Sequence, residues 1–342
     1  MILDGHSAQA IATAAQALQA GELVGLPTET VYGLAADASN PTAVAKIFAA
    51  KGRPSDHPLI VHVADASGVA HFASEVPDFA QQLIQAFWPG PLTLILPRRP
   101  DIGAAAAGGQ ASIGLRCPSH PVAHALLGAA RALGVHGVAA PSANQFGRVS
   151  PTTAAHVQGE FGADLLILDG GACEVGIEST LIDCTRGAPV LLRPGSISRA
   201  QVQQVCGIQL LSKEELLALN APAPRASGML ESHYAPKAKV RLMDAVALQA
   251  SLDLLGNSLP VSGGNGVAPR PTIATYARTV LRSPSPQVLR RRMPDDAAAT
   301  AQQLFAVLRE FDEQGVKLIW IETPPDTPEW EGVRDRLQRA AA

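Results

Sequence analysis

Short apolar runs alternate with helical segments along residues 1–206, and glycine or proline turns separate them. This alternation predicts an α/β domain, in which helices cover a sheet. Asn40 before Pro41 and Ser198 before its helix are expected N-caps. The expected strands span residues 22–26, 59–63, 92–96, 112–116, 137–140, 165–168, 179–183 and 190–193, and the expected helices span residues 8–20, 41–50, 77–86, 121–133, 152–161 and 198–205.

The pattern changes after residue 207. Residues 221–228 are rich in alanine and proline, which predicts an extended linker. We therefore expect a first domain over residues 1–207, a linker over 208–239 and a smaller α/β domain over 240–342. The expected elements of this last domain are strands 240–243 and 317–322 and helices 296–314 and 329–340.

Composition excludes several classes of protein. The net charge of -3 and the aromatic content of 4% argue against a nucleic-acid-coated protein or a base-stacking platform. The four cysteines form no Cys-x-x-Cys pair, so we expect reduced thiols and no zinc knuckle. No apolar run reaches the length of a membrane span, and the N-terminus lacks a signal peptide, so a cytoplasmic protein is expected.

The first candidate site is a polar loop that follows the apolar residues 23–26. Residues 27–34 read Pro-Thr-Glu-Thr-Val-Tyr-Gly-Leu, which places two hydroxyls and a carboxylate close together. Lys51 and Arg53 flank a glycine just beyond the expected helix 41–50. Cations at a helix end also have a purely structural interpretation, because they interact favourably with the helix dipole. Together the two segments favour a site for an anion beside a small polar ligand.

More polar groups follow expected strands later in this domain. Ser142 and Asn144 offer a hydroxyl and an amide after one strand, although an ordinary turn explains them equally well. Glycine-rich residues 169–171 and 176–180 form another polar approach to a strand, and Arg193 ends the next strand. Both interpretations, ligand contact and local turn, remain open for these segments.

The motifs that the chain lacks narrow the chemistry. It has no Gly-x-x-x-x-Gly-Lys-Ser/Thr loop, no convincing Gly-x-Gly-x-x-Gly and no Gly-x-Ser-x-Gly nucleophile turn. Ser112 and Arg116 bracket one more strand and add a hydroxyl and a cation. Such a site positions reactants and stabilises charge, as phosphoryl or nucleotidyl transfer requires. His120 and His124 have helical spacing but no third ligand, so no metal site is expected.

These segments, in this order and spacing, resemble the YrdC-like superfamily, in the two-domain form of threonylcarbamoyl-AMP synthases. The resemblance implies a YrdC-like twisted mixed sheet with flanking helices around a cationic pocket, plus a smaller Rossmann-like α/β C-terminal domain. It covers most of residues 20–240. It is carried by residues 27–34, 51–54, 58–62, 112–118, 141–144, 169–171, 178–180, 193–195, 228–229 and 233–236.

The resemblance implies that L-threonine, bicarbonate and ATP give threonylcarbamoyl-AMP and pyrophosphate, the first step of threonylcarbamoyladenosine modification of tRNA beside the anticodon. The threonine amine adds to bicarbonate or CO₂, and the carbamate then attacks the α-phosphate of ATP. Mg²⁺ is the implied cofactor, held mainly by the ATP phosphates and by no side chain. The implied partner is the downstream tRNA threonylcarbamoyl transferase machinery, and the reaction itself does not require contact with tRNA.

The resemblance also assigns residues. Lys51 and Arg53 are the implied catalytic residues, because their charges meet the phosphates. His57 stands where many members have asparagine, and Ser112 stands where many have threonine. The implied threonine contacts are Thr30, His62, Arg116, Ser179 and the backbone of Ala140. The implied ATP contacts are Lys51, Arg53, His57, Ser112, Ser142, Asn144, Ser150, Arg193 and Tyr234. Because Tyr234 lies in the linker, we expect the linker to fold over the ATP site as a lid.

Two other functions remain as alternatives. A basic concave pocket could hold structured RNA without catalysis, although the net charge and the few aromatic residues count against this. YrdC-like domains also occur in hydrogenase-maturation carbamoyltransferases. Those proteins carry additional acylphosphatase-like and zinc-finger modules, which this cysteine-poor chain lacks. The arginine run at residues 290–292 is expected to be a solvated face.

Overall fold

The computed structural model describes the chain except for residues 213–214, 216–232, 257–271, 284 and 286. The chain divides into two compact units. The N-terminal unit comprises residues 1–146 and 150–229, and the C-terminal unit comprises residues 147–149 and 230–342. The sequence places residues 147–149 in the first domain, whereas the structure groups them with the second. The expected linker over residues 208–239 lies largely outside the described residues, including its proline-rich part at 221–228, and its described residues include strand β11 (Leu211–Ser212).

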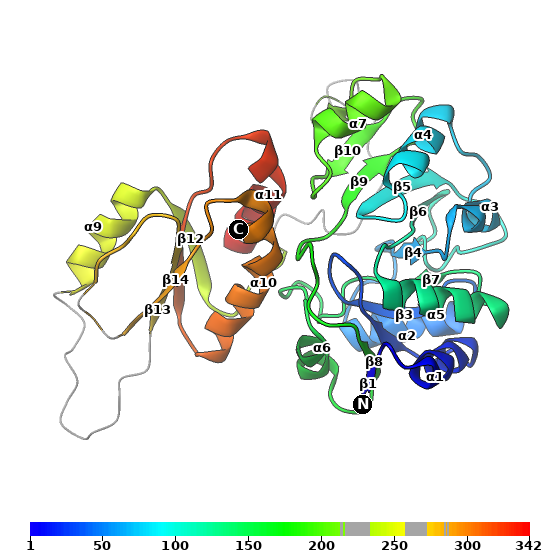
Figure 1. Cartoon of the computed structure of the whole chain (residues 1–342), viewed down its shortest axis with the longest axis horizontal. Coiled ribbons are helices and arrows are strands. Elements are labelled where there is room, and N and C mark those ends of the chain that lie inside the picture. The colour runs from blue at the N-terminus through cyan, green and yellow to red at the C-terminus, as the bar shows by residue number, and fades with distance from the viewer. Residues whose placement is uncertain (213–214, 216–232, 257–271, 284, 286) are drawn as a thin grey trace. The chain divides into compact units, whose positions relative to one another are not determined.

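The N-terminal unit is built on a large mixed sheet (Figure 1). Over the described residues the sheet has eleven strands in the order β1-β8-β2-β3-β7-β4-β6-β5-β9-β10-β11. The strands are β1 (Ile2–Asp4), β2 (Val24–Leu26), β3 (Gly33–Asp37), β4 (Ile60–His62), β5 (Leu92–Pro97), β6 (Ser112–Arg116), β7 (Val138–Ala139), β8 (Leu166–Asp169), β9 (Thr180–Asp183), β10 (Val190–Arg193) and β11 (Leu211–Ser212).

Helices cover this sheet on both faces. Leu34 and its neighbour Ala35 belong to two different buried clusters, as expected for successive residues of a strand with a core on each side. One cluster contains residues of α1 and α5, which pack side by side in Figure 1. The helices are α1 (Ala8–Gln19), α2 (Pro41–Lys51), α3 (Val69–Phe72), α4 (Asp78–Phe87), α5 (Pro121–Ala132), α6 (Ala154–Phe161), α7 (Arg199–Cys206) and the 3₁₀ turn η1 (Ala66–Gly68).

Helix ends near the candidate site follow from local sequence. The Asn40 side chain accepts hydrogen bonds from two backbone N–H groups at the start of α2, and Pro41 occupies the first turn. The same helix ends at Gly52, whose φ of 61° is left-handed. Ser198 and Gln201 form a capping box at the start of α7. The predicted caps are confirmed.

Three strands of the large sheet were not predicted: β1, β3 and β11. Of these, β3 directly follows the polar loop. The sequence predicts a loop over residues 27–34, but Gly33 already begins β3, which pairs with β2 and β7. The strand sequence is Gly-Leu-Ala-Ala-Asp, which contains no β-branched or aromatic residue. Its neighbours in the sheet, rather than its own propensity, make it a strand.

The C-terminal unit has a separate parallel sheet of four strands in its described residues, in the order β12-β15-β13-β14. This is the predicted Rossmann-like arrangement. The elements are β12 (Lys239–Met243), α9 (Ala245–Gly256), β13 (Ile273–Ala277), β14 (Val288–Arg292), α10 (Ala297–Glu313), β15 (Leu318–Glu322), the 3₁₀ turn η2 (Pro328–Trp330) and α11 (Glu331–Ala341). Strands β13 and β14 and helix α9 were not predicted. Residues 290–292 are exposed on β14, as predicted.

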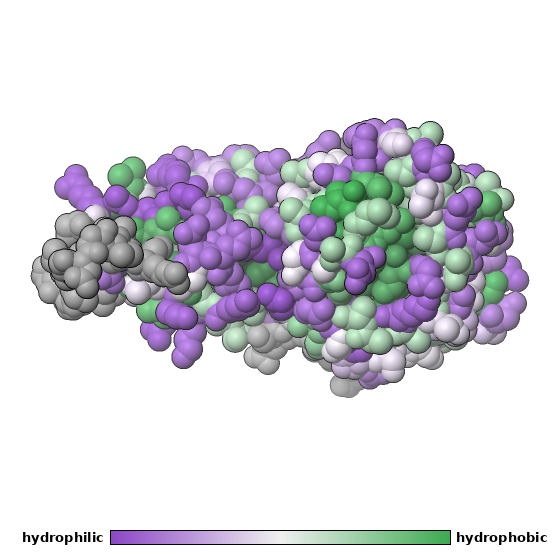
Figure 2. All heavy atoms as spheres, turned by 90° about the horizontal axis from the view of Figure 1, so that it is seen from below, coloured by the Kyte–Doolittle hydropathy of each residue, from purple (hydrophilic) through white to green (hydrophobic). Residues whose placement is uncertain are grey.

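In the described part of the chain, no helix is long and apolar enough to cross a membrane. Figure 2 shows apolar side chains gathered on one face of the N-terminal unit, beside a largely polar surface.

Candidate active site

The polar loop between β2 and β3 folds around a buried ion pair. Arg116, at the end of β6, places Nη2 2.6 Å from Oε1 of Glu29, and each side chain is only 4% exposed. Arg116 Nη1 also donates to Thr30 Oγ1 at 2.8 Å. Burial alone would raise the pKa of Glu29, but Arg116 and nearby backbone N–H groups hold this pKa below its usual value of 4.5. The loop therefore holds the Arg116 guanidinium in a fixed position and supplies buried hydroxyls beside it.

His62 lies beside this ion pair as an uncharged imidazole. It ends β4 and is the register partner of Arg116 in the parallel pair of β4 and β6. Burial and the nearby Arg116 charge lower the pKa of His62 to about 3. Its Nδ1 atom is buried without a protein hydrogen-bond partner. A neutral ring with an unsatisfied nitrogen can accept or donate a hydrogen bond to a small polar ligand.

A second cluster of hydroxyls lies at the start of β9. Ser179 Oγ is 2.7 Å from Thr93 Oγ1, and Arg193 Nη2 donates to the same Ser179 oxygen at 3.2 Å. The Arg193 guanidinium also donates to the Ser179 carbonyl. The glycine two residues after Arg193 is required by close packing, because a Cβ at Gly195 would lie 2.4 Å from the backbone nitrogen of Thr180. Arg193, which was predicted to contact ATP, therefore contacts Ser179, which was predicted to contact threonine.

Lys51 organises the turn that carries Ser142 and Asn144. Its ammonium donates to the carbonyl of Ser142 at 2.6 Å and to the carbonyl of Asn144. Burial and the nearby Arg53 charge place the pKa of Lys51 well below its usual range. The cation and the turn, which lie far apart in the sequence, therefore form one structure.

Arg53 and His57 share an aromatic neighbour. The guanidinium carbon of Arg53 lies 5.9 Å from the centre of the Phe146 ring, and the His57 ring meets the same ring edge-on at 5.6 Å. Arg53 also donates to the carbonyl of Pro58 at 2.9 Å. Phe146 is tied to the same region because its backbone N–H donates to the Lys51 carbonyl at 3.0 Å.

The remaining predicted contact residues do not belong to either of these clusters. Ser150 is fully buried, and its hydroxyl donates to Glu178 Oε1 at 2.5 Å. The N–H of Ala140 already donates to the Ile60 carbonyl, which leaves only its carbonyl for a backbone contact with a ligand. Ser112 begins β6 and Arg116 ends it, so their Cα atoms are about 13 Å apart. Tyr234 belongs to the C-terminal unit and is described below with that unit.

Residues 169–171 and His120 make local structural contacts. The hydroxyl of Tyr32 donates to the carbonyl of Gly171 at 2.7 Å and accepts from the N–H of Gly170, so residues 169–171 anchor this tyrosine. His120 caps α5, because its Nδ1 accepts from the Val122 N–H. Its Nε2 lies 3.2 Å from the Gly170 carbonyl. Among the described residues, no group of three or more His, Cys, Asp or Glu could hold a metal ion.

Four residues of the site received no specific role from the sequence, although Glu29 and Glu178 lie in segments that were named as candidates. Glu29 and Glu178 are buried carboxylates that hold a predicted residue each, and Thr93 is the hydroxyl beside Ser179. Phe146 supports Arg53 and His57. A threonine inside the apolar run of β5 was a usable signal for Thr93, since a fully buried hydroxyl requires a partner.

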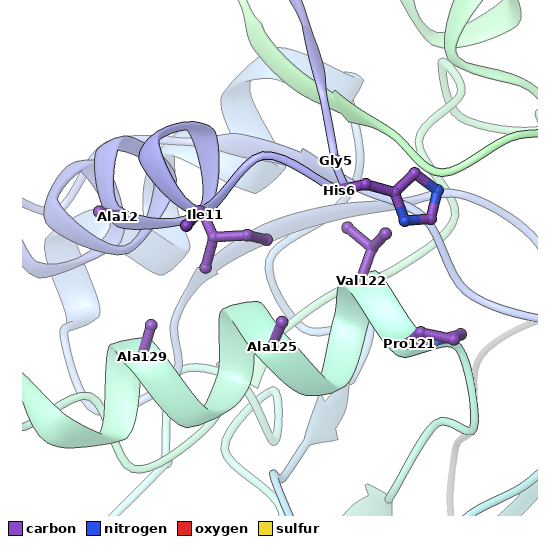
Figure 3. A pocket seen from close by; sticks show the side chains of 9 residues that line it. Gly5, His6, Ile11, Ala12, Pro121, Val122, Ala125 and Ala129 are labelled. Carbon is purple, nitrogen blue, oxygen red and sulfur yellow. The ribbon is translucent and has the colours of Figure 1, made fainter.

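A cavity of about 440 Å³ lies elsewhere on the N-terminal unit, between α1 and α5 (Figure 3). Apart from the ring of His6, it is lined mainly by small apolar side chains, including Ala12, Val122 and Ala125. None of the residues predicted to contact threonine or ATP lines it. The candidate active site is thus the polar cluster and not this apolar cavity.

The class of protein follows from these features: a twisted mixed α/β unit with a buried polar and cationic cluster, joined in one chain to a parallel Rossmann-like unit. Residues 16–195 match the family of Sua5, YciO and YrdC proteins, described as "Telomere recombination". Residues 197–342 match the family described as "Threonylcarbamoyl-AMP synthase, C-terminal domain".

Known proteins resemble the chain over nearly its whole length. It is 39% identical to the threonylcarbamoyl-AMP synthase of Bacillus subtilis, over 97% of this chain and 92% of that protein. It is 35% identical to the enzyme of the same name from Pyrococcus abyssi, over 97% of this chain and 94% of that protein. The crystal structure of P. abyssi Sua5 with L-threonine matches with a TM-score of 0.88 and 32% identity, over 100% of this chain and 97% of that chain.

The chain therefore belongs to the threonylcarbamoyl-AMP synthase family, in its two-domain form.

Proposed function

We propose that this protein synthesises threonylcarbamoyl-AMP from L-threonine, bicarbonate and ATP and releases pyrophosphate. The observation that carries the proposal is the buried cluster of Thr30, His62 and Arg116, which suits a small zwitterion with a hydroxyl. Two-domain relatives bear the name of this enzyme, and one of them was solved with L-threonine. The product enters threonylcarbamoyladenosine modification of tRNA, and we place the enzyme in the cytoplasm with the transferase machinery that uses the product.

The threonine half of the site accounts for recognition of the amino acid. Arg116 supplies a guanidinium for the carboxylate, and Glu29 and Thr30 hold that guanidinium in place. His62 is neutral, so it can accept a hydrogen bond from the ammonium or hydroxyl group of threonine without charge repulsion. The Ser179 hydroxyl and the backbone carbonyl of Ala140 complete this subsite.

The reaction begins when the threonine amine attacks the carbon of CO₂, or of bicarbonate with loss of water. A C–N bond forms, the amine loses a proton, and a carbamate results. A carbamate oxygen then attacks the α-phosphorus of ATP, the bond to the β-phosphate breaks, and pyrophosphate leaves. The protein supplies position and charge, because the site offers cations and hydroxyls and requires no covalent intermediate.

The ATP half of the site contains the cations. Arg53 meets the phosphates directly, while Lys51 fixes the turn of Ser142 and Asn144. Burial and Arg53 lower the pKa of Lys51, and the negative phosphates would favour its charged form. The other ATP contacts that we propose are His57, Ser112, Ser150, Arg193 and Tyr234. The donors of this cluster are cations and hydroxyls, which suit phosphate oxygens better than a metal ion. Mg²⁺ would therefore be held mainly by the ATP phosphates and would offset their charge.

A matched pair of arginine variants tests this assignment. Arg116→Gln removes the buried guanidinium, whereas Arg131→Gln removes an arginine that is 43% exposed and paired with Asp65 on the surface. Threonine-dependent pyrophosphate release from ATP, with bicarbonate and Mg²⁺ present, should fall about 100-fold or more in Arg116→Gln and stay within twofold in Arg131→Gln. Equal rates in the two variants would refute the threonine subsite.

A further inference from the structure

Residues 147–149 pack with the C-terminal unit although the chain before and after them belongs to the N-terminal unit. The chain leaves the N-terminal unit after Phe146, whose N–H is held by the Lys51 carbonyl. It returns at Ser150, whose hydroxyl is held by Glu178. We call residues 147–149 the bridge segment. It joins the turn that Lys51 organises to Ser150, so it connects two parts of the proposed ATP site.

The C-terminal unit holds the backbone of the bridge segment at both ends. The N–H of Ala235 donates to the Gly147 carbonyl at 3.0 Å, and Arg148 forms an isolated parallel bridge with Ala235. At the other end, the guanidinium of Arg309, on α10, donates to the carbonyl of Val149. Val149 is 3% exposed, so its carbonyl depends on an internal donor, and Arg309 supplies one.

The donor at Ala235 is itself fixed by an unusual backbone conformation. Tyr234, the residue before it, has a φ of 60°, which is costly for a residue with a Cβ. The Tyr234 ring stacks on Phe305 of α10 at 5.5 Å, and the Arg336 guanidinium of α11 lies 5.3 Å from its centre. Packing against these two helices holds the tyrosine in place and thereby orients the N–H of Ala235.

We propose that Arg309 is a positioning residue for ATP binding: it fixes the bridge segment and thereby the position of Ser150. Arg309 acts through the backbone carbonyl of Val149 and does not touch the substrates. This inference rests on the proposed function, and it assigns to the C-terminal unit a part in ATP binding that does not require the linker to close as a lid. Threonine binding, which uses Thr30, His62 and Arg116, should depend little on Arg309.

The test compares three variants of the full chain. Arg309→Met removes the donor, Arg309→Lys keeps a cation that can reach the carbonyl, and Arg291→Met is the control. Arg291 pairs with Glu310, the residue next to Arg309 on α10, so its loss perturbs the same helix without affecting the bridge segment. Pyrophosphate release gives the KM values for ATP and threonine. Hydrogen–deuterium exchange of residues 144–152 without substrates gives a readout that does not require activity.

In Arg309→Met, the KM for ATP should rise about tenfold, while the KM for threonine should stay within twofold. Hydrogen–deuterium exchange of residues 144–152 should become about tenfold faster. Both changes correspond to the loss of one charge-assisted hydrogen bond. Arg309→Lys should recover part of both effects, and Arg291→Met should match the parent. Unchanged exchange, or equal rises in both KM values, would overturn the inference. If the parent made no product, the proposed function would fail, and the exchange experiment would still decide whether Arg309 holds the bridge segment.

Discussion

Replacing Glu29 by glutamine tests whether the Glu29–Arg116 ion pair stabilises the polar loop. At the observed separation of 2.6 Å, two unit charges attract by about 6 kcal/mol for an effective dielectric constant of about 20. Desolvation of two side chains that are each 4% exposed offsets part of this attraction. Removing one partner leaves the other charge buried and unpaired, so Glu29→Gln should lower the free energy of unfolding by about 3–5 kcal/mol.

Urea unfolding of the parent, Glu29→Gln, Arg116→Met and the double variant measures this effect. If the two side chains stabilise the loop as a pair, the loss in free energy of unfolding should not be additive. The loss in the double variant should be smaller than the sum of the two single losses by about 2 kcal/mol. The two units of the chain could unfold separately, so the transition of the N-terminal unit should be followed through its own signal. Of the three tryptophans of the chain, only Trp88 lies in this unit, so its fluorescence provides that signal when Trp320 and Trp330 are replaced by phenylalanine. Additive losses, or a loss below about 1 kcal/mol in Glu29→Gln, would refute the reasoning.

Three further outcomes follow from the site and the fold. Lys51→Met should reduce the rate of synthesis at saturating substrates about 100-fold or more. The reason is that the carbonyls of the turn at Ser142 lose their donor and the phosphates lose a cation. A rate like that of the parent would contradict this. Because the pKa of His62 is about 3, the parent and His62→Gln should show pH–rate profiles of the same shape between pH 5 and 8, and loss of an ionisation in the variant would contradict this. Because the pKa of Glu29 is lowered in the folded state, its ionised form stabilises the fold at pH values above its usual pKa of 4.5. The free energy of unfolding should therefore decline as the pH falls below 4.5 in the parent, and should decline less in Glu29→Gln. Equal declines would contradict the pairing.

Much of the fold could be predicted from local sequence signals. Asn40 with Pro41, the left-handed Gly52 and the capping box at Ser198 are signals in the chain itself, and the structure has each of them. Strand β3 could not be predicted in this way, because its small residues gain their strand conformation from β2 and β7. Strands β13 and β14 were likewise missed, since their register depends on β15 and on each other.

The site was predicted as a set of residues, but the sequence does not show how those residues are connected. Lys51 was expected to neutralise phosphate, and the structure shows in addition that it holds the carbonyls of Ser142 and Asn144. Arg193 was assigned to ATP, yet the partners described here are atoms of Ser179, a predicted threonine contact. Contacts between segments about 90 residues apart, as between Lys51 and Ser142, depend on the tertiary fold and leave no local pattern.

The most direct test of the proposed activity is an incubation of the protein with ATP, Mg²⁺, bicarbonate and L-threonine, followed promptly by mass spectrometry. ¹³C-labelled bicarbonate should appear in threonylcarbamoyl-AMP, with equimolar pyrophosphate, and both products should disappear when threonine is omitted. Folded protein that binds ATP and threonine but forms no labelled adenylate would contradict the account.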